Sequence, residues 1–475
     1  MKIHEHDLNQ GEWFEATRVT VALVALTVAG AAAYLAYRRQ RTADENQRTA
    51  AQTQLITANA YQLSVEQYSE GLQRELRKRF TDAVLQLSHS MATVRIAGAF
   101  SLAALVDEWT AQGNRVDAQV CIEVLCGYLR LPYSPVHGNS DSVKRTVTSP
   151  RLNPDGTVGA GDVTEHYEFR QNDRISRLTI LRMIAEHLRN VGDSGESWSC
   201  YGFDFRSATL EDVNFEDCTF GAVSFAGTRF VGDANFQGVK FKEAVSFAGA
   251  HFESNCSFDG AQFDNECEFT NARFFGTWAR FVSCNFGGEF SFEETFASMV
   301  VFSACTFKVD ASFEFSQFTR SVLFSVDTVF HGMANFIGCK FGKFSVGGRS
   351  AVRDKLFRTS KTESKFIDGG PVKFMSECYF LGAIFEDEAV FQGTVFEGKV
   401  HFERMGYAGR RSLGTSSVEF RGGANFSNAT FNQGAIFTGV NFGDKPVVLR
   451  NINSPLPLAF DWSEAPDLKP DAVVL

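Results

Sequence analysis

The chain has 475 residues, which is enough for about two or three domains and a large core. Apolar residues make up 44% of it, which excludes a disordered chain, and the formal net charge of −10 shows no basic footprint of a nucleic-acid-binding protein. Phe supplies 48 residues whereas Trp supplies 5 and Tyr 10, and this bias toward one aromatic residue indicates a repeated structural position.

The first element in chain order is an uncharged segment, VTVALVALTVAGAAAYLAY, at residues 19–37. At about 1.5 Å per helical residue it can cross the ~30 Å hydrocarbon core of a bilayer. Three arginines follow it directly: Arg38, Arg39 and Arg41. We therefore predict a single-pass membrane protein with residues 1–18 outside the cytoplasm and the bulk of the chain in the cytoplasm. A cleaved signal peptide is the alternative, although its leading segment would be basic and its apolar run shorter.

Residues 42–131 are predicted to form a helical juxtamembrane segment. Six apolar residues recur there at spacings of three and four, on one helical stripe: Tyr61, Val65, Tyr68, Leu72, Leu76 and Phe80. Packing of this stripe on the following helices is favoured. A self-associating coiled coil stays possible, although the segment has few heptads with defined core residues.

Residues 79–109 are predicted to form two helices with a break near the sequence SHSM, and a third helix ends at Pro132. Residues 132–171 are rich in turn-forming residues and are predicted to be an exposed loop with one hairpin. A helix and a linker occupy residues 172–197. Cys121 and Cys126 are too far apart for a CxxC pair and are interpreted as core residues.

Beyond Phe215, Phe returns every five or six residues, and 34 of the 48 Phe residues follow this rule. Its most regular stretch is the structural ladder Phe247, Phe252, Phe258, Phe263, Phe269 and Phe274. Val, Cys, Ala or Thr stands two residues before nearly every such Phe. Spacings of five and six fit neither the period of a helix nor that of a strand, so a short extended stretch followed by a corner is predicted. Repetition of this unit indicates a solenoid.

In this pattern the chain resembles the pentapeptide-repeat family over roughly residues 203–442. The resemblance implies a mainly β fold, a right-handed quadrilateral β-helix, which we place at residues 198–445, after one transmembrane helix and an α-helical segment. A C-terminal tail, 446–475, follows. The chain departs from the simple family pattern by using Phe rather than Leu and by alternating steps of five and six. A coil of about 22 residues, with an extra residue at two of its four corners and nine or ten coils in all, is expected.

Seven cysteines occupy the small position two residues before Phe: Cys218, Cys256, Cys267, Cys284, Cys305, Cys339 and Cys378. Ala and Val take the same position elsewhere, so packing is favoured over metal binding. The sequence contains no HExxH, GxSxG or phosphate-loop pattern. We therefore assign no catalytic, cofactor-binding or metal-binding residue, and expect neither an enzyme nor a small-molecule substrate.

Charge is distributed unevenly along the repeats. Residues 211–270 carry eleven acidic and three basic residues, whereas an insertion at 343–365 carries seven basic and two acidic ones. A second insertion at 403–417 is also basic. A solvated loop is favoured for the first insertion over a docking site for an acidic partner or lipid headgroups. Its cations are nevertheless the candidate partner contacts: Arg349, Arg353, Lys355, Arg358 and Lys361.

These observations favour a membrane-tethered scaffold that presents a pentapeptide-repeat β-helix to an unidentified protein partner, with self-association left open. The family resemblance implies one alternative, a mimic of DNA that modulates a DNA-binding enzyme such as a topoisomerase. The membrane segment and the modest charge of the repeats speak against it. No nucleic acid is expected as a partner, and no site for an enzyme or a ligand receptor is found in the helical segment.

Overall fold

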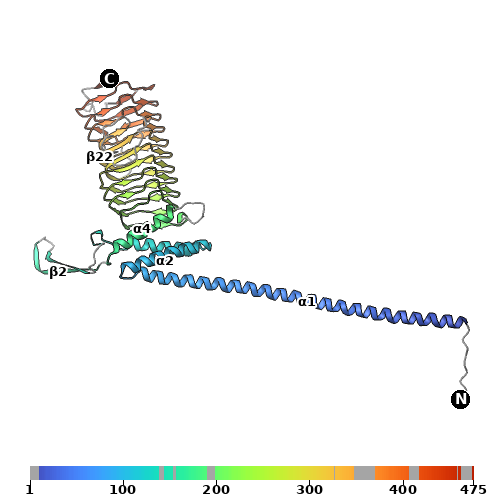
Figure 1. Cartoon of the computed structure of the whole chain (residues 1–475). Helices are drawn as coiled ribbons and strands as arrows, with labels where there is room; N and C mark the ends of the chain where they lie inside the picture. Colours follow the sequence, from blue (N-terminus) through green and yellow to red (C-terminus); the bar gives the residue numbers. More distant parts are fainter. Residues whose placement is uncertain are drawn as a thin grey trace, which may run out of the picture. The chain divides into compact units, whose positions relative to one another are not determined.

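The computed structural model describes residues 10–137, 144–152, 157–168, 170–189, 198–325, 327–346, 370–405, 417–456, 458–461 and 473–474. The chain divides into two compact units, Met1–Lys78 and Arg79–Leu475. Helices form the first unit and the start of the second, and a long stack of strands forms the rest of the second, coloured green to red in Figure 1.

The first unit consists of most of helix α1 (Gln10–Leu87), a continuous helix of 78 residues. Its sequence contains no Pro and is rich in Ala, which explains why it is not interrupted. One 18-residue window of α1 has a mean hydropathy of 2.1 and is entirely exposed. Among the described residues α1 is the one helix whose length and composition would allow it to cross a membrane, a property that signal sequences share.

The stripe predicted to pack on the following helices is largely exposed. The side chains of Tyr61 and Tyr68 are 72% and 76% exposed, and Val65 is exposed as well. Leu72 is half-buried and Leu76 is buried. Packing of Tyr61, Val65 and Tyr68 on the following helices stays a prediction.

The second unit begins with a helical region. It contains α2 (Ala92–Ala111), α3 (Arg115–Arg130), the 3-10 turn η1 (Pro135–His137), β1 (Lys144–Leu152), β2 (Val158–Glu168), α4 (Asp173–Arg189) and η2 (Trp198–Cys200). The predicted break near His89 is present, since α1 ends at Leu87 and α2 begins at Ala92. Asn114 caps α3 by accepting a hydrogen bond from the N–H of Asp117 at 3.3 Å. The antiparallel hairpin β1–β2 lies in the segment predicted to be a loop with one hairpin.

The Phe-rich repeats form a parallel β-solenoid of about ten coils, and each coil visits four faces in turn. Face 1 is an 11-stranded sheet: β3 (Phe203–Asp204), β6 (Val223–Ser224), β10 (Val245–Ser246), β14 (Cys267–Glu268), β18 (Phe290–Ser291), β21 (Ala311–Ser312), β24 (Ala334–Asn335), β27 (Cys378–Tyr379), β31 (Val400–Glu403), β35 (Ala435–Thr438) and β37 (Ala459–Asp461). Face 2 contains β4 (Thr209–Glu211), β7 (Arg229–Val231), β11 (His251–Phe252), β15 (Arg273–Phe274), β28 (Ile384–Phe385) and β32 (Glu419–Phe420).

Face 3 contains β8 (Ala234–Asn235), β12 (Cys256–Ser257), β16 (Ala279–Val282), β29 (Ala389–Val390), β33 (Ala424–Asn425), β36 (Val447–Val448) and β38 (Val473–Val474). Three longer strands cross from face 2 to face 3 and join these faces into one 16-stranded sheet: β19 (Phe296–Ser303), β22 (Gln317–Ser325) and β25 (Lys340–Val346). Face 4 is a 9-stranded sheet: β5 (Thr219–Phe220), β9 (Lys240–Phe241), β13 (Gln262–Phe263), β17 (Asn285–Phe286), β20 (Thr306–Phe307), β23 (Val329–Phe330), β26 (Lys373–Phe374), β30 (Val395–Phe396) and β34 (Thr430–Phe431).

The register confirms the predicted coil length, because Val245 pairs with Cys267, 22 residues later. The alternation of five and six residues has a simple geometric origin. At the five-residue corners the second residue after Phe has a positive φ, as at Gly249 (+64°) and Gly260 (+72°). Such a residue turns the chain sharply and favours Gly, whereas the six-residue corners use an additional residue instead. The predicted extra residue at two of the four corners is confirmed.

The core is a set of columns of phenylalanine rings. Every ladder residue is buried, and rings in successive coils stack face to face, as Phe252 does on Phe274 with centroids 4.7 Å apart. Rings from different faces meet edge to face, as Phe247 and Phe258 do at 5.5 Å. Both arrangements are preferred by aromatic quadrupoles, and each buried Phe adds roughly 1.5–3 kcal/mol of gross hydrophobic stabilisation.

In two places the solenoid has a small residue where the ladder has Phe and a Phe where the small residue is expected. Ala297 stands in the register position where neighbouring coils have Phe274 and Phe318, and Phe290 stands in the small position that Cys267 and Ala311 occupy. The ring of Phe290 lies 4.6 Å from that of Phe286 and is buried. Large and small side chains are thus exchanged within one coil. Phe344 and Val346 in β25 show the same exchange, since Val346 pairs with Phe324 and Phe344 with Val322.

The exchange predicts a strong coupling between two substitutions. Phe290→Ala should lower the free energy of unfolding by about 3–5 kcal/mol, because it leaves a cavity beside the rings of Phe286 and Phe292. Ala297→Phe alone should also be destabilising, because the coil is already filled. The double variant restores the regular ladder, so it should be more stable than the sum of the single effects by at least about 1 kcal/mol in chemical denaturation.

The control is Glu289→Ala in the same coil, where the side chain is exposed and the change should stay within about 0.5 kcal/mol. If the changes in unfolding free energy of Phe290→Ala and Ala297→Phe simply add in the double variant, the two positions do not compensate for each other in packing.

Candidate interaction surfaces

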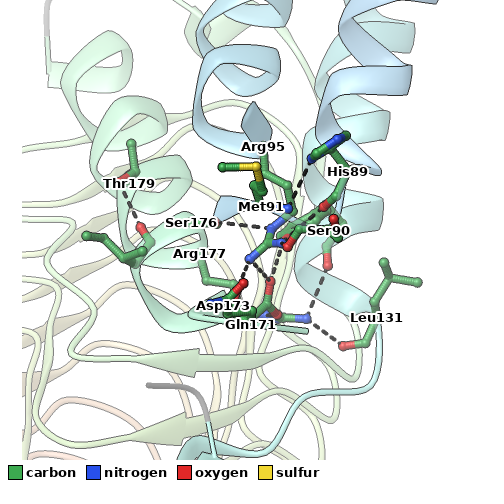
Figure 2. A network of polar contacts seen from close by, with 12 residues as sticks. His89, Ser90, Met91, Arg95, Leu131, Gln171, Asp173, Ser176, Arg177 and Thr179 are labelled. Carbon is green, nitrogen blue, oxygen red and sulfur yellow. Dashed lines mark hydrogen bonds and ion pairs between the residues drawn. The ribbon is translucent and has the colours of Figure 1, made fainter. Parts of the chain in front are cut away.

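The helical region contains a buried cluster of charged residues, shown in Figure 2. Arg95 is completely buried, and Asp173 and Arg177 are nearly so. Arg177 donates from Nε to Oδ2 of Asp173 at 2.8 Å, and Nη2 of Arg95 lies 3.7 Å from Oδ1. Tyr128 donates its hydroxyl proton to the same carboxylate. One carboxylate therefore stands between two guanidinium groups.

Both arginines also donate to backbone carbonyl groups, and Nε of Arg95 donates to the hydroxyl of Ser176 at 3.3 Å. Arg95 donates to the carbonyls of His89 and Ser90, just beyond the end of α1, at 3.1 and 2.6 Å. Arg177 donates to Leu129 and Leu131, at the end of α3, at 2.8 Å each. The ends of two helices carry partial negative charge, which offsets the excess positive charge of the cluster. The cluster thus fixes the ends of α1 and α3 against the start of α4.

The same helical region covers the first coils of the solenoid through arginines. Arg130 of α3 binds Asp204 at 2.5 Å. Arg174 of α4 binds Glu211 and Asp212 at 2.7 Å each. An open edge of a parallel solenoid would expose unpaired backbone groups, so these helices act as its cap.

A second polar group joins α2, α4 and η2. Trp198 donates from Nε1 to Asp107 at 2.9 Å, and Nε2 of His187 lies 3.6 Å from the other oxygen of that carboxylate. The rings of His187 and Trp198 are stacked at 4.1 Å. Burial disfavours the charged form of His187, but the hydrogen bonds with Asp107 and the Met183 carbonyl outweigh it and raise its pKa. Burial also acts against ionised Asp107, but hydrogen bonds from His187 and Trp198 leave the pKa of Asp107 lowered.

Face 1 of the solenoid is acidic. Its strands and edges carry acidic residues in five of the coils: Glu266, Glu268, Glu289, Glu293, Asp310, Glu314, Glu377 and Glu403. The coil of β24 carries none, and Lys399 stands in line with Glu377. The hydroxyl of Ser246 donates to Glu268 at 2.7 Å, and His401 lies 2.8 Å from Glu403. Glu266 and Glu289 are exposed. The sequence pattern missed this face, although residues about 22 positions apart, such as Glu266 and Glu289, would have indicated it.

Acidic residues of the other faces and of the first coils are often paired with arginine. Besides the carboxylates bound by Arg130 and Arg174, Glu253 binds Arg229 at 2.5 Å and Asp259 binds Arg280. Four of the eleven acidic residues of the stretch 211–270 are therefore paired with arginine: Glu211, Asp212, Glu253 and Asp259. The acidic surface that persists lies further along the rod, on face 1.

Comparison with known families now identifies the repeats. A family model of pentapeptide repeats, described as having 9 copies, matches residues 199–240 and 236–284. These residues form the first coils, with the register described above. The chain is a pentapeptide-repeat protein. No curated protein and no solved structure matches it significantly. Beyond residue 284 the pentapeptide-repeat register continues through the strand pairing, for example from Val400 to Ala435.

The predicted partner contacts of this pentapeptide-repeat protein, Arg349, Arg353, Lys355, Arg358 and Lys361, lie outside the described residues. So does most of the second insertion. The described residues end at Val346 and begin again at Gly370, so the first insertion falls between β25 and β26 in the sequence.

The seven cysteines of the small position are all buried in the pentapeptide-repeat core, as are Cys121 and Cys126 in the helices. Burial raises the pKa of the Cys218 thiol to about 12 and that of Cys256 and Cys267 well above the usual value. Such thiols are poor nucleophiles and poor metal ligands. Within the described ranges no group of three or more His, Cys, Asp or Glu side chains could hold a metal ion. These cysteines therefore act as small core residues.

The pair His187–Asp107 predicts a pH dependence of stability. Because the pKa of His187 is raised, its contribution is complete below the ordinary histidine value of about 6.5 and is lost as the pH rises through the raised value. Because the pKa of Asp107 is lowered, its contribution to stability is present above the ordinary aspartate pKa and is lost as the pH falls through the lowered value. We expect the melting temperature of the full chain to fall as the pH rises above the ordinary histidine value and through the raised pKa of His187, and this fall to be absent in His187→Gln.

His331→Gln is the matched control, since His331 is exposed on the solenoid. The same alkaline fall in His187→Gln as in the unmodified chain would contradict a stabilising imidazolium at this position.

Proposed function

We propose that this pentapeptide-repeat protein is a membrane-tethered scaffold that performs no catalysis. In this proposal residues 19–37 of α1 are the anchor, and the solenoid, wound right-handed as in the family, lies in the cytoplasm. The observation that carries the proposal is that α1 exposes an uncharged apolar segment, whereas the apolar ladder side chains are packed inside the solenoid. An exposed apolar helix of this length is stable in a bilayer and unfavourable in water.

The orientation follows from the charges and aromatic residues around the anchor. Trp13 and Phe14 precede it, Tyr34 and Tyr37 lie near its end, and Arg38, Arg39 and Arg41 follow. Aromatic rings favour the membrane interface, and arginines favour the cytoplasmic side. A cell-membrane location with the solenoid inside the cell is the arrangement these residues support.

Face 1 is the surface that we propose for partner binding. It carries eight carboxylates in five coils, and Glu266 and Glu289 among them are exposed. Such a face would attract a basic protein segment, with binding that weakens as salt increases. The basic insertions supply a separate candidate surface, for an acidic partner or for lipid headgroups.

The anchor predicts how the full chain behaves on cell fractionation. Leu23→Arg together with Leu26→Arg should release the protein from the membrane fraction after an alkaline wash, because each charge near the bilayer centre costs about 2.5–3.5 kcal/mol. Ile56→Arg with Leu63→Arg is the matched control, since both residues are exposed apolar positions of the same helix outside the anchor.

Equal retention of the two double variants would contradict the anchor. A mature protein whose N-terminus lies near residue 33, found by mass spectrometry, would identify a cleaved signal sequence instead.

The alternative function is mimicry of DNA, and face 1 is the one observation that favours it. A duplex, however, carries negative charge on all sides, and the remaining surface here is mixed. Lys240 and Lys242 lie on or beside face 4, and Arg229 and Arg273 are in line with His251 on face 2. The carboxylates of the first coils are also bound by cap arginines. We therefore rank the scaffold above the mimic.

A supercoiling assay with a DNA topoisomerase separates the two functions. We expect the detergent-solubilised full chain not to inhibit supercoiling, because its carboxylates gather on one face and do not surround the solenoid. Inhibition by the unmodified chain would favour the mimic. The mimic is the correct function if Glu266→Lys with Glu289→Lys then removes the inhibition, whereas Asp264→Lys with Asp387→Lys leaves it. The second pair changes exposed acidic residues away from face 1. Neutralising Glu211 and Asp212 is unsuitable, because it would also break contacts of the cap with Arg174.

A further inference from the structure

Helix α1 carries an uncharged stripe over residues 22–72, whereas the same sector contains Glu15, Arg18 and Arg79 nearer the two ends of the helix. With about 100° of rotation per residue, one sector roughly 100° wide contains these residues: Ala22, Ala25, Ala29, Ala32, Ala33, Ala36, Gln40, Ala43, Gln47, Ala50, Ala51, Gln54, Ala58, Tyr61, Val65, Tyr68, Ser69 and Leu72. We call this set the α1 stripe. It contains no Asp, Glu, Lys or Arg.

Charged residues of α1 lie outside the stripe throughout residues 38–78. They include the ion pairs Arg41–Glu45 and Arg74–Glu70, which are one helical turn apart and mostly exposed. The two faces of the helix therefore differ sharply in polarity. Segregation of this kind over many turns is typical of a helix that packs along one side.

The composition of the stripe changes where the anchor ends. Within residues 19–37 it consists only of alanine, and Ala25 and Ala29 repeat at the spacing that allows two membrane helices to approach closely. Farther along it consists of Ala and Gln, and then of Tyr61, Val65, Tyr68 and Leu72. The larger side chains of Tyr61 and Tyr68 are 72% and 76% exposed, so the structure leaves them without an apolar partner.

From these observations we propose that the α1 stripe is a parallel dimer interface, and that its occupant is the α1 stripe of a second copy of this chain. In a two-fold parallel pair each stripe residue faces its own counterpart, so uncharged residues meet uncharged ones and both charged faces stay in solvent or at lipid headgroups. The parallel orientation rests on the proposed membrane anchor, because two copies inserted in one bilayer point the same way and have the same register.

Cysteine cross-linking in membranes tests the interface with the full chain. The background is Cys200→Ser, because Cys200 is the exposed one of the ten cysteines. Single cysteines are then placed on the stripe, at Ala58→Cys and Val65→Cys. Matched controls lie on the charged side, at Ile56→Cys and Leu63→Cys, which are exposed apolar positions in the same turns.

We expect at least a roughly fivefold larger disulfide-linked dimer fraction for the stripe cysteines under mild oxidation, since only there do two identical side chains face each other. Equal fractions, or a maximum at Ile56 and Leu63, would overturn the proposal.

Light scattering in detergent provides a second measurement. Val65→Glu with Tyr68→Glu should convert a dimer into a monomer, whereas the control Leu63→Glu should leave the dimer intact. If the unmodified chain is a monomer, the proposed interface is wrong. Fractionation of the same samples keeps the two proposals separate. Stripe cross-links in a protein that does not sediment with membranes would refute the anchor alone, and a membrane-bound protein with uniform cross-linking would refute the interface alone.

Discussion

The whole solenoid depends on one packing constraint: each side of each coil must supply inward volume at a fixed register position. Parallel strands are about 4.8 Å apart, and phenylalanine rings stack at nearly that distance, as the 4.7 Å between Phe252 and Phe274 shows. A column of rings can therefore continue for many coils without strain. The corners, the small residue two positions before Phe and the buried cysteines all follow from keeping these columns in line.

The first coil of a solenoid has no preceding coil to pair with its backbone groups. The helices that cap it bind the first coils through charged side chains. The arginines of α3 and α4 reach the carboxylates of the first coils, while the cluster of Arg95, Asp173 and Arg177 holds the helices themselves. Removing one member of such a buried cluster would leave another charge unpaired, which is far more costly than losing an exposed ion pair. The cap is therefore fixed in position by polar contacts, whereas the solenoid is fixed by apolar ones.

The sequence predicted the parts of the fold that repeat locally. The spacing of Phe determined the solenoid, the coil of about 22 residues and the role of residues such as Cys256, since each depends on neighbours within one coil. The exchange of Phe290 and Ala297 could not be predicted, because it depends on which side chains of adjacent coils share a space. Face 1 was missed for the same reason, since its carboxylates are far apart in the chain. The period of Tyr61 and Tyr68 identified a face of the helix but not the partner of that face, and both side chains are exposed.

Because the inward positions are determined by packing, the outward positions are those that can vary in chemistry without changing the fold. On face 1 they carry carboxylates in five coils, so negative charge gathers in a band on one side of the rod, interrupted at the β24 coil. At physiological salt the field of such a band decays within about 8 Å, which is too short to act around the corner onto faces 2 and 4. A partner that lays a flat or extended basic surface on one side would meet the full band. A groove that encloses a DNA duplex would also meet the lysines and arginines of the neighbouring faces, and this one-sidedness favours a scaffold over a mimic.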